Sequence, residues 1–287
     1  LYYSKTIRKH ETITFRSYFN RDQWLPISPL EDVSTWLTDA NMRFASHADY
    51  ASRSQEEILG DFLHEFEYLE IDTLETVILL NLPNGIEKVA LNPVAQWAPC
   101  FGPTVADFNN DGHEDVFLSQ NLDTGNHEWG RMDAGHGLLL LGDGEGSLNA
   151  IPSTASGIRL KNEQRGTATA DFNQDGKMDL AVLERGEGAH LFVNQTEHTG
   201  VTVSLEGPSA NPHCIGARLQ KINLQTGNVY GPAKEIQSGS GYRSLNALKH
   251  VFAHPGKPFQ IQVTWPNGKI SRHSIPSGIT KVTLQQP

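Results

Sequence analysis

A nine-residue pattern, D-F-N-x-D-G-x-x-D, occurs twice in this chain, at residues 107–115 and 171–179. Apolar residues stand on both sides of each copy: Ala106 and residues 116–118 around the first, Ala170 and residues 180–183 around the second. Short apolar runs that flank a polar, glycine-containing turn are typical of two strands joined by a loop. The sequence therefore predicts a strand–loop–strand unit that is present in two copies.

Oxygen-bearing side chains occupy positions 1, 3, 5 and 9 of both copies, and the glycine at position 6 permits a sharp turn. An all-oxygen set suits Ca²⁺ better than Zn²⁺, which prefers Cys and His. Position 7 would add a main-chain carbonyl. The candidate ligands are Asp107, Asn109, Asp111, His113 and Asp115 in the first loop, and Asp171, Asn173, Asp175, Lys177 and Asp179 in the second. The alternative is a pair of Asx-rich turns without a metal.

The loops are not expected to be EF-hands. An EF-hand needs a bidentate Glu at position 12 of the loop and a helix on each side. Position 12 is Leu118 in the first copy and Val182 in the second, and the flanking residues have strand character. A calcium loop between two strands is the remaining interpretation.

Composition limits the classes of partner and compartment. The net charge of −10 and the pI of about 5.6 argue against nucleic acid as the main partner. No apolar run is long enough to predict a membrane span. The start of the sequence lacks an initiator Met and a signal peptide, so a processed or partial chain is expected. Two cysteines, Cys100 and Cys214, leave one bridge and two free thiols equally open.

Residues 1–68 form the first predicted segment, with strands before residue 25 and two helices after it. Ser28 with Glu31, and Ser54 with Glu57, each match a capping box at the start of an apolar helical pattern. Helices over about 28–38 and 54–67 are therefore expected, packed on a neighbouring sheet.

Residues 69–197 form the second predicted segment, made of repeated β units. The two loops begin 171 − 107 = 64 residues apart, a period that suits one propeller blade per repeat. The pattern predicts the end of one blade at 69–91, a full blade at 98–150 and most of another at 164–195. A closed propeller needs about four blades. We expect the rest to come from residues outside this sequence or from another chain, and the preferred interpretation is the C-terminal part of a longer protein.

Residues 198–287 change in character and predict a small all-β domain of sandwich or barrel type, with strict alternation at 200–205 and a Pro-Asn-Gly turn at 266–268. Its long polar loop is rich in glycine, at residues 239–244. The fold class is thus mainly β: propeller blades with a short helical insertion, followed by the small β domain.

The two loops between strands resemble FG-GAP (VCBS-type) repeats, the blade units of integrin α-chain-like propellers. The tail is similar to an ASPIC/UnbV domain on the basis of residues 211–217, 239–242 and 263–269. Together they resemble the cartilage acidic protein family over about residues 69–287. One departure is that Arg243-Ser-Leu245 stands where a Ser-Gln pair commonly follows the Gly-Ser-Gly-Tyr run.

The resemblance implies a secreted protein, extracellular or periplasmic, with Ca²⁺ in the blade loops and no catalytic activity. We expect an adhesion or assembly protein that binds a protein or polysaccharide partner. The alternative is a propeller enzyme, a hydrolase or lyase acting on an extracellular polymer, with a loop calcium as Lewis acid. A structural calcium takes its ligands from the protein, whereas a catalytic metal keeps a position open to solvent.

Two weaker motifs and one missing motif also bear on function. The polar stretch 125–133 is either a loop on a ligand-binding face or an exposed linker. The sequon at Asn194 is a glycan site only in a eukaryotic secretory pathway, and the end of a strand is the safer interpretation. No G-x-S-x-G motif anchors hydrolase chemistry.

Overall fold

A computed structural model describes residues 2–8, 11–123, 130–254, 256 and 258–287. Most of the polar stretch 125–133 lies outside the described residues. The chain divides into two compact units, Leu1–Leu74 and Glu75–Pro287, which are treated separately below. No helix among the described residues has both the length and the apolar character needed to cross a membrane.

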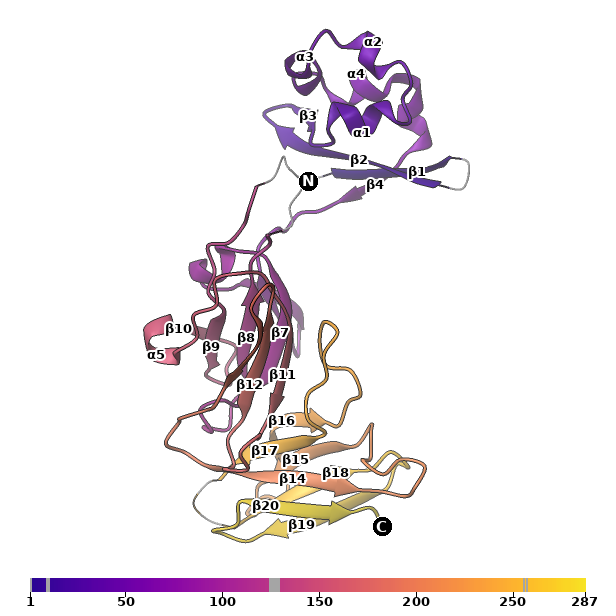
Figure 1. Ribbon diagram of the computed structural model, residues 1–287. Coiled ribbons are helices and arrows are strands. Elements are labelled where there is room, and N and C mark those ends of the chain that lie inside the picture. The colour runs from indigo at the N-terminus through magenta and orange to yellow at the C-terminus, as the bar shows by residue number, and fades with distance from the viewer. Residues whose placement is uncertain (1, 9–10, 124–129, 255, 257) are drawn as a thin grey trace. The chain divides into compact units, whose positions relative to one another are not determined.

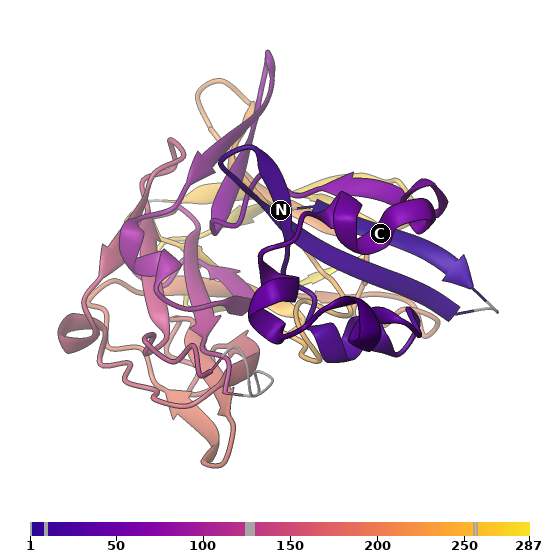
Figure 2. The ribbon, with the colours of Figure 1, turned by 90° about the horizontal axis from the view of Figure 1, so that it is seen from above.

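The first unit is a four-stranded antiparallel sheet with helices on one of its faces (Figures 1 and 2). The strand order is β3-β2-β1-β4. Its core joins Phe15 of the sheet to Val33, Ile58 and Leu59 of the helices, all fully buried. The expected packing of helices on a sheet is therefore confirmed. The elements are β1 (Tyr2–Arg8), β2 (Glu11–Asn20), β3 (Gln23–Pro26), α1 (Leu30–Ser34), α2 (Ala40–Arg43), α3 (His47–Ala51), α4 (Gln55–Leu59), the 3-10 helix η1 (Gly60–Glu65) and β4 (Glu67–Glu70).

One of the two expected capping boxes is present. Ser54 Oγ accepts from the Glu57 N–H, and Glu57 Oε2 accepts from the Ser54 N–H at 2.9 Å. The box at Ser28 is wrong: Pro29 is the N-cap of α1 without a side-chain bond, and Ser28 Oγ instead accepts from the Arg16 N–H at 2.8 Å. The Ser28 hydroxyl thus accepts a hydrogen bond from the main chain of β2 and does not cap the helix. Both helices are also shorter than expected, α1 ending at Ser34 and α4 at Leu59.

The strand β4 belongs to the first unit. It pairs antiparallel with β1, with Glu70 opposite Tyr2. The sequence assigned Leu69 and Ile71 to the first blade, together with the strands after them, because alternation alone does not reveal which strand a segment pairs with. The division between the units accordingly falls after Leu74.

The second unit begins with an isolated hairpin and two larger sheets. Its strand–loop–strand units are confirmed: β7 pairs antiparallel with β8 and β11 with β12, and each nine-residue loop joins the pair. The sheets have the orders β5-β6, β10-β9-β8-β7 and β11-β12-β13. The elements are β5 (Val77–Leu82), β6 (Gly85–Ala90), the 3-10 helix η2 (Pro93–Gln96), β7 (Cys100–Ala106), β8 (Asp115–Gln120), β9 (Leu138–Gly142), β10 (Leu148–Ile151), α5 (Ser153–Ser156), β11 (Gln164–Ala170), β12 (Asp179–Glu184) and β13 (Gly188–Phe192).

The two larger sheets meet along β7 and β11, which lie side by side (Figure 1). The hydroxyls of Thr104 and Thr167 contact each other there, and a Cβ on Gly102 would lie 2.6 Å from the Arg165 carbonyl oxygen. Glycine is therefore required for this close approach. Each sheet in the described part of the chain is open, and none closes on itself.

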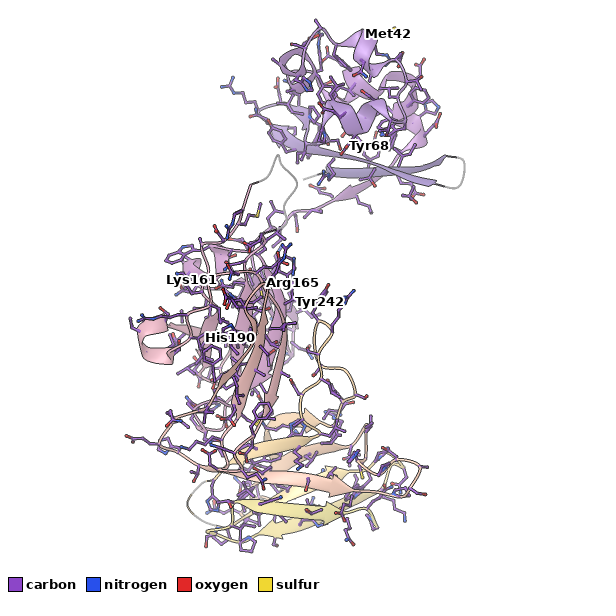
Figure 3. The ribbon with its side chains drawn as sticks, viewed as in Figure 1. Met42, Tyr68, Lys161, Arg165, His190 and Tyr242 are labelled. Carbon is purple, nitrogen blue, oxygen red and sulfur yellow. The ribbon has the colours of Figure 1, made fainter. Side chains whose placement is uncertain are left out.

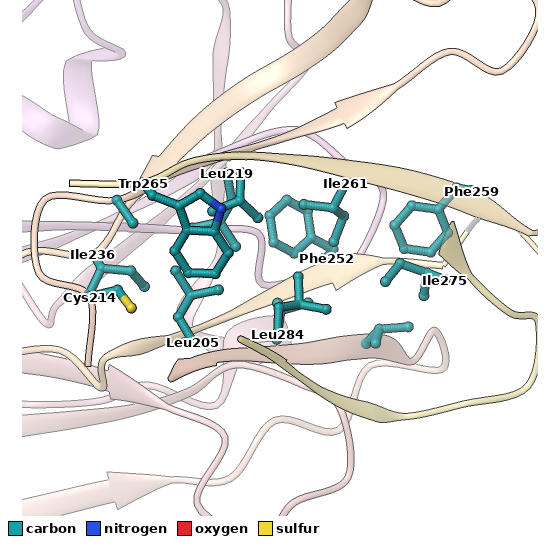
Figure 4. Close-up of a cluster of buried hydrophobic side chains, with 14 residues drawn as sticks. Leu205, Cys214, Leu219, Ile236, Phe252, Phe259, Ile261, Trp265, Ile275 and Leu284 are labelled. Atoms are coloured by element: carbon teal, nitrogen blue, oxygen red, sulfur yellow. The ribbon is translucent and has the colours of Figure 1, made fainter. Parts of the chain in front are cut away.

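The end of the second unit is a two-sheet β-sandwich. One sheet has the order β17-β14-β20, with β14 and β20 parallel, and the other β16-β15-β18-β19. Their facing side chains form one buried cluster that includes Phe252, Ile261 and Trp265 (Figure 4). Cys214 is buried in this cluster, and both Cys100 and Cys214 are free thiols. The strands are β14 (Gly200–Glu206), β15 (Arg218–Ile222), β16 (Val229–Glu235), β17 (Lys249–Ala253), β18 (Phe259–Thr264), β19 (Ile270–Ile275) and β20 (Lys281–Gln285).

Candidate metal-binding loops

The first loop is a tight turn in which carboxylates accept main-chain N–H groups. Asp107 Oδ1 accepts from the N–H of Asp111 at 3.1 Å, and Asp107 Oδ2 accepts from Gly112 at 2.9 Å. Asp111 Oδ1 accepts from the His113 N–H at 2.8 Å. Asn110 and Gly112 have φ angles of 56° and 98°, so both adopt a conformation that L side chains rarely take. The glycine at position 6 therefore has the conformational role expected of it.

The second loop repeats this geometry with one difference. Asp171 Oδ2 accepts from the Gly176 N–H at 3.1 Å, and Asp175 Oδ1 accepts from the Lys177 N–H at 3.1 Å. The other oxygen, Asp171 Oδ1, is buried and has no hydrogen-bond partner among the described residues. Its equivalent in the first loop, Asp107 Oδ1, has the Asp111 N–H. A buried acceptor without a donor is uncommon and points to a group that would satisfy it.

The aspartate at position 9 ties each loop to the next strand. Asp115 accepts from the N–H groups of Phe108 at 2.7 Å and Gly142 at 2.9 Å. Asp179 accepts in the same way from Phe172 at 2.9 Å and Asn194 at 2.8 Å. Both side chains are fully buried. Burial raises the pKa of Asp115 to about 6, although the N–H donors oppose the shift.

Two asparagines that sequence reasoning gave no structural role connect the loops to each other. Asn194 Nδ2 donates to the carbonyl oxygens of Phe108 at 2.7 Å and Met178 at 3.0 Å. Asn110 Nδ2 donates to Gly176 at 3.2 Å and His198 at 3.0 Å. The Asn194 amide nitrogen, which a glycan would modify, thus has two acceptors. Asn110 occupies the variable position 4 of the pattern, so the repeat gave no signal for it.

The sandwich contacts both loops, but with different chemical groups. At the first loop, Lys234 Nζ lies 2.8 Å from Glu114 Oε1, and Lys221 Nζ lies 3.6 Å from where a Cβ on Gly112 would be. At the second loop, Thr202 Oγ1 donates to Asp171 Oδ2 at 2.6 Å. The Gly200 N–H also donates to the Gly176 carbonyl oxygen at 2.8 Å. These four sandwich residues were not among the predicted site residues.

The loop residues suit a hard cation in chemistry, although their carboxylates are committed to N–H groups. Among the described residues, no three His, Cys, Asp or Glu side chains are gathered closely enough to hold a metal ion. Several carboxylate oxygens, such as Asp107 Oδ2 and Asp111 Oδ1, accept only one hydrogen bond each and keep a second lone pair. The all-oxygen donor set and the unsatisfied Asp171 Oδ1 fit Ca²⁺. The structure thus brings the predicted residues together in two loops of similar conformation.

A serine–histidine pair lies in the sandwich, far from the loops in sequence. Ser271 Oγ is 2.7 Å from His273 Nε2, but it also accepts from the indole N–H of Trp265 at 2.7 Å. Trp265 is buried in the sandwich core. The pair therefore satisfies a buried indole donor, which is a structural role.

The glycine-rich loop at 239–244 brings its neighbouring residues to the free edge of β11. The Ala247 N–H donates to the Thr169 carbonyl oxygen at 2.9 Å, and Asn246 Oδ1 accepts from the Thr169 N–H at 3.0 Å. The Tyr242 carbonyl oxygen lies 3.5 Å from where a Cβ on Gly166 would be (Figure 3). The segment thus covers part of an edge that would otherwise expose unpaired main-chain groups.

A cavity of about 540 Å³ opens between the two repeat sheets beside the first loop. Its walls are mainly apolar, with Leu139, Leu180 and Phe192 among them, and Asn109 and Thr196 contribute polar groups. Its size falls within the range of small-molecule sites.

Comparison with known proteins places a repeat on this part of the chain. Residues 107–182, which run from the first residue of the first loop to just beyond the second loop, match the FG-GAP-like repeat. The chain therefore contains an FG-GAP-like repeat region. The first strand–loop–strand unit begins just before the match, and the second ends just after it.

The chain is also similar to cartilage acidic protein 1. It is 26% identical to the Homo sapiens protein over 185 residues, which cover 63% of this chain and 27% of that protein. It is 27% identical to the Xenopus tropicalis protein over 184 residues, which cover 60% of this chain and 26% of that protein. The matched part is about a quarter of the length of these relatives.

Proposed function

We propose that this chain is a calcium-binding, non-catalytic part of a secreted adhesion or assembly protein, extracellular or periplasmic, and that Ca²⁺ binds both loops. The observation that carries the proposal is Asp171 Oδ1, a buried acceptor without a donor inside an all-oxygen loop. The duplicated pattern supports it, because two loops agree at every ligand position. Extracellular calcium is abundant enough to fill sites of modest affinity.

In this proposal the side chains at positions 1, 3, 5 and 9 and the carbonyl oxygen at position 7 bind the ion. Calcium would offset the repulsion among three aspartates in each loop. Loop ends that are tied to one ion hold the strands on either side together. Asn110 and Asn194 would couple the conformations of the two loops, since the side-chain amide of each donates to a main-chain carbonyl of the other repeat.

We further propose that the repeat sheets are completed by residues outside this sequence or by another chain. In the described part of the chain, the last repeat sheet has three strands where the first has four, and one edge of β13 has no neighbouring strand. Leu183 and Leu191 are each 54% exposed on that sheet. Open edges with exposed apolar side chains pair readily with another strand. A protein or polysaccharide partner would then bind the assembled surface.

Isothermal titration of the metal-free chain with CaCl₂ tests the calcium proposal. Two bound ions per chain are expected, with one lost in Asp107→Asn and the other in Asp171→Asn. Lys177→Ala is the matched control, because position 7 contributes its carbonyl whatever the side chain. Calcium binding that survives both aspartate substitutions would contradict the proposal.

A further inference from the structure

Two lysines of the sandwich approach the first loop from outside the repeat. The Lys234 side chain is 11% exposed, and its Nζ lies 2.8 Å from Glu114 Oε1. Lys221 is partly buried, and its Nζ lies against Gly112. Asp107, Gly112 and both lysines line one small void of about 10 Å³. The two ammonium groups and the first ligand position are therefore packed together at one contact.

The electrostatic effects agree with this placement. Burial lowers the pKa of Lys221, and Asp107 is the strongest group acting in the opposite direction. Burial raises the pKa of Asp107, and Lys234 is the strongest group that opposes that rise. Partly buried charges are screened much less by solvent and salt than exposed ones. The lysines thus already supply part of the positive charge that the first loop needs.

The sandwich brings different groups to the second loop. The neutral hydroxyl of Thr202 donates to Asp171 Oδ2, and Asp171 Oδ1 stays without a donor. Lys281 does reach this loop, but its side chain is exposed and binds Gln174 at 3.4 Å. Gln174 is at position 4, which is not a ligand position. The equivalent aspartates of the two loops therefore face different charges.

We propose that Lys221 and Lys234 are built-in counter-ions of the first loop, so that the second loop binds Ca²⁺ more tightly than the first. This inference rests on the proposed calcium function. It adds an order of affinity between the two loops and a coupling between Ca²⁺ binding and the contact of the first loop with the sandwich. A cation entering the first loop meets two ammonium groups, which repel it. Because binding effects are reciprocal, Ca²⁺ in the first loop weakens the contact between that loop and the sandwich.

The experiment is a calcium titration of the full chain by calorimetry in low-salt buffer, after chelator treatment and dialysis. Two affinities are expected, with the tighter one missing from Asp171→Asn and the weaker one missing from Asp107→Asn. Replacing the lysines, in Lys221→Gln, Lys234→Gln and the double variant, should tighten only the weaker site. Removing one nearby unit charge changes affinity by roughly tenfold.

Lys281→Gln is the matched control, because it removes a sandwich lysine that contacts the second loop away from the ligand positions. It should leave both affinities unchanged. Circular dichroism confirms that each variant is folded, and the two single variants provide independent readings if the double variant is not. A weaker site that keeps its affinity in both lysine variants overturns the inference.

The remaining outcomes separate this inference from the calcium proposal. Equal affinities at the two loops, or a tighter site that is lost in Asp107→Asn, overturn the rank order while calcium binding stands. A chain that binds no Ca²⁺ at either loop overturns both. Salt provides a second reading: raising the ionic strength should narrow the difference between the sites, since screening weakens the lysine repulsion.

Discussion

The two loops have the same pattern but different surroundings. The aspartates at positions 5 and 9 of the two loops accept equivalent N–H groups, and so does one oxygen of each position-1 aspartate, so the turn itself is repeated closely. Outside the loops, Lys221 and Lys234 face the first, whereas Thr202 faces the second. A repeated motif therefore fixes the conformation of a loop without fixing its electrostatics. The latter depends on which part of the chain folds against it.

The largest expected effect tests what the loops share. Asp115→Ala and Asp179→Ala each remove a fully buried carboxylate that accepts two short main-chain N–H bonds, which costs about 3 kcal/mol of unfolding free energy in metal-free protein. The losses should be similar, because the two aspartates make equivalent bonds. Urea denaturation in the presence of a chelator measures them.

A matched control for these substitutions is Asp143→Ala. Asp143 also accepts two main-chain N–H groups, from Glu145 and Ser147, but it lies in an exposed surface turn. Water replaces its bonds, so the loss should be much smaller. Equal losses in all three variants would show that burial of the position-9 aspartates is not what makes them important.

Removal of calcium should destabilise the repeat sheets and leave the stability of the sandwich nearly unchanged. A site that is filled at a hundred times its dissociation constant adds about 2.7 kcal/mol to stability. EDTA at low salt should therefore speed amide exchange in β7, β8, β11 and β12, with little change in β18 and β19 of the sandwich core. Exchange followed by mass spectrometry distinguishes these regions. Uniform protection with and without EDTA would show that the metal is marginal to stability.

The side-chain amide of Asn194, which bridges the two loops, should contribute less to the unfolding free energy than the position-9 aspartates do. Asn194→Asp removes two donors and places a carboxylate beside the carbonyl oxygens of Phe108 and Met178, for a loss of about 2 kcal/mol. Gln195→Glu makes the same change of charge at an exposed neighbour and should be nearly silent. Thermal denaturation compares the two variants. If both behave alike, added charge rather than the lost bridge explains the result.

Local patterns predicted local structure well. The strands around each loop, the turn at Gly112 and Gly176, and the capping box at Ser54 all follow from neighbours within a few residues. The box at Ser28 was wrong because the Arg16 N–H, which lies in β2, takes the hydroxyl. A competing donor twelve positions away in the chain is invisible to a helix motif.

The difference in charge around the two loops could not be predicted from the sequence for the same reason. Lys221 and Lys234 follow the first loop by more than a hundred residues, and nothing in their local pattern sets them apart from ordinary strand lysines. Asn110 occupies the variable position 4 of the repeat pattern, and Asn194 was interpreted as part of a sequon or as the end of a strand. Their roles depend on pairing between distant segments, which only the fold establishes. The two loops were predictable from the sequence; the charges that face them were not.

The smallest expected effect is a pH response confined to the surroundings of the first loop. Burial lowers the pKa of His250, with a further lowering from Lys234 and opposing effects from the Glu235 carbonyl and Glu114. The folded state therefore binds this proton less readily than the unfolded state, and stability falls as pH drops below the unfolded value of about 6.5. His250→Gln should reduce the loss in urea midpoint between pH 7.5 and 5.5. The effect of His250→Gln should be smaller in a Lys234→Gln background, because the positive charge beside His250 is then absent. An unchanged pH profile in His250→Gln would assign the acid response to other groups.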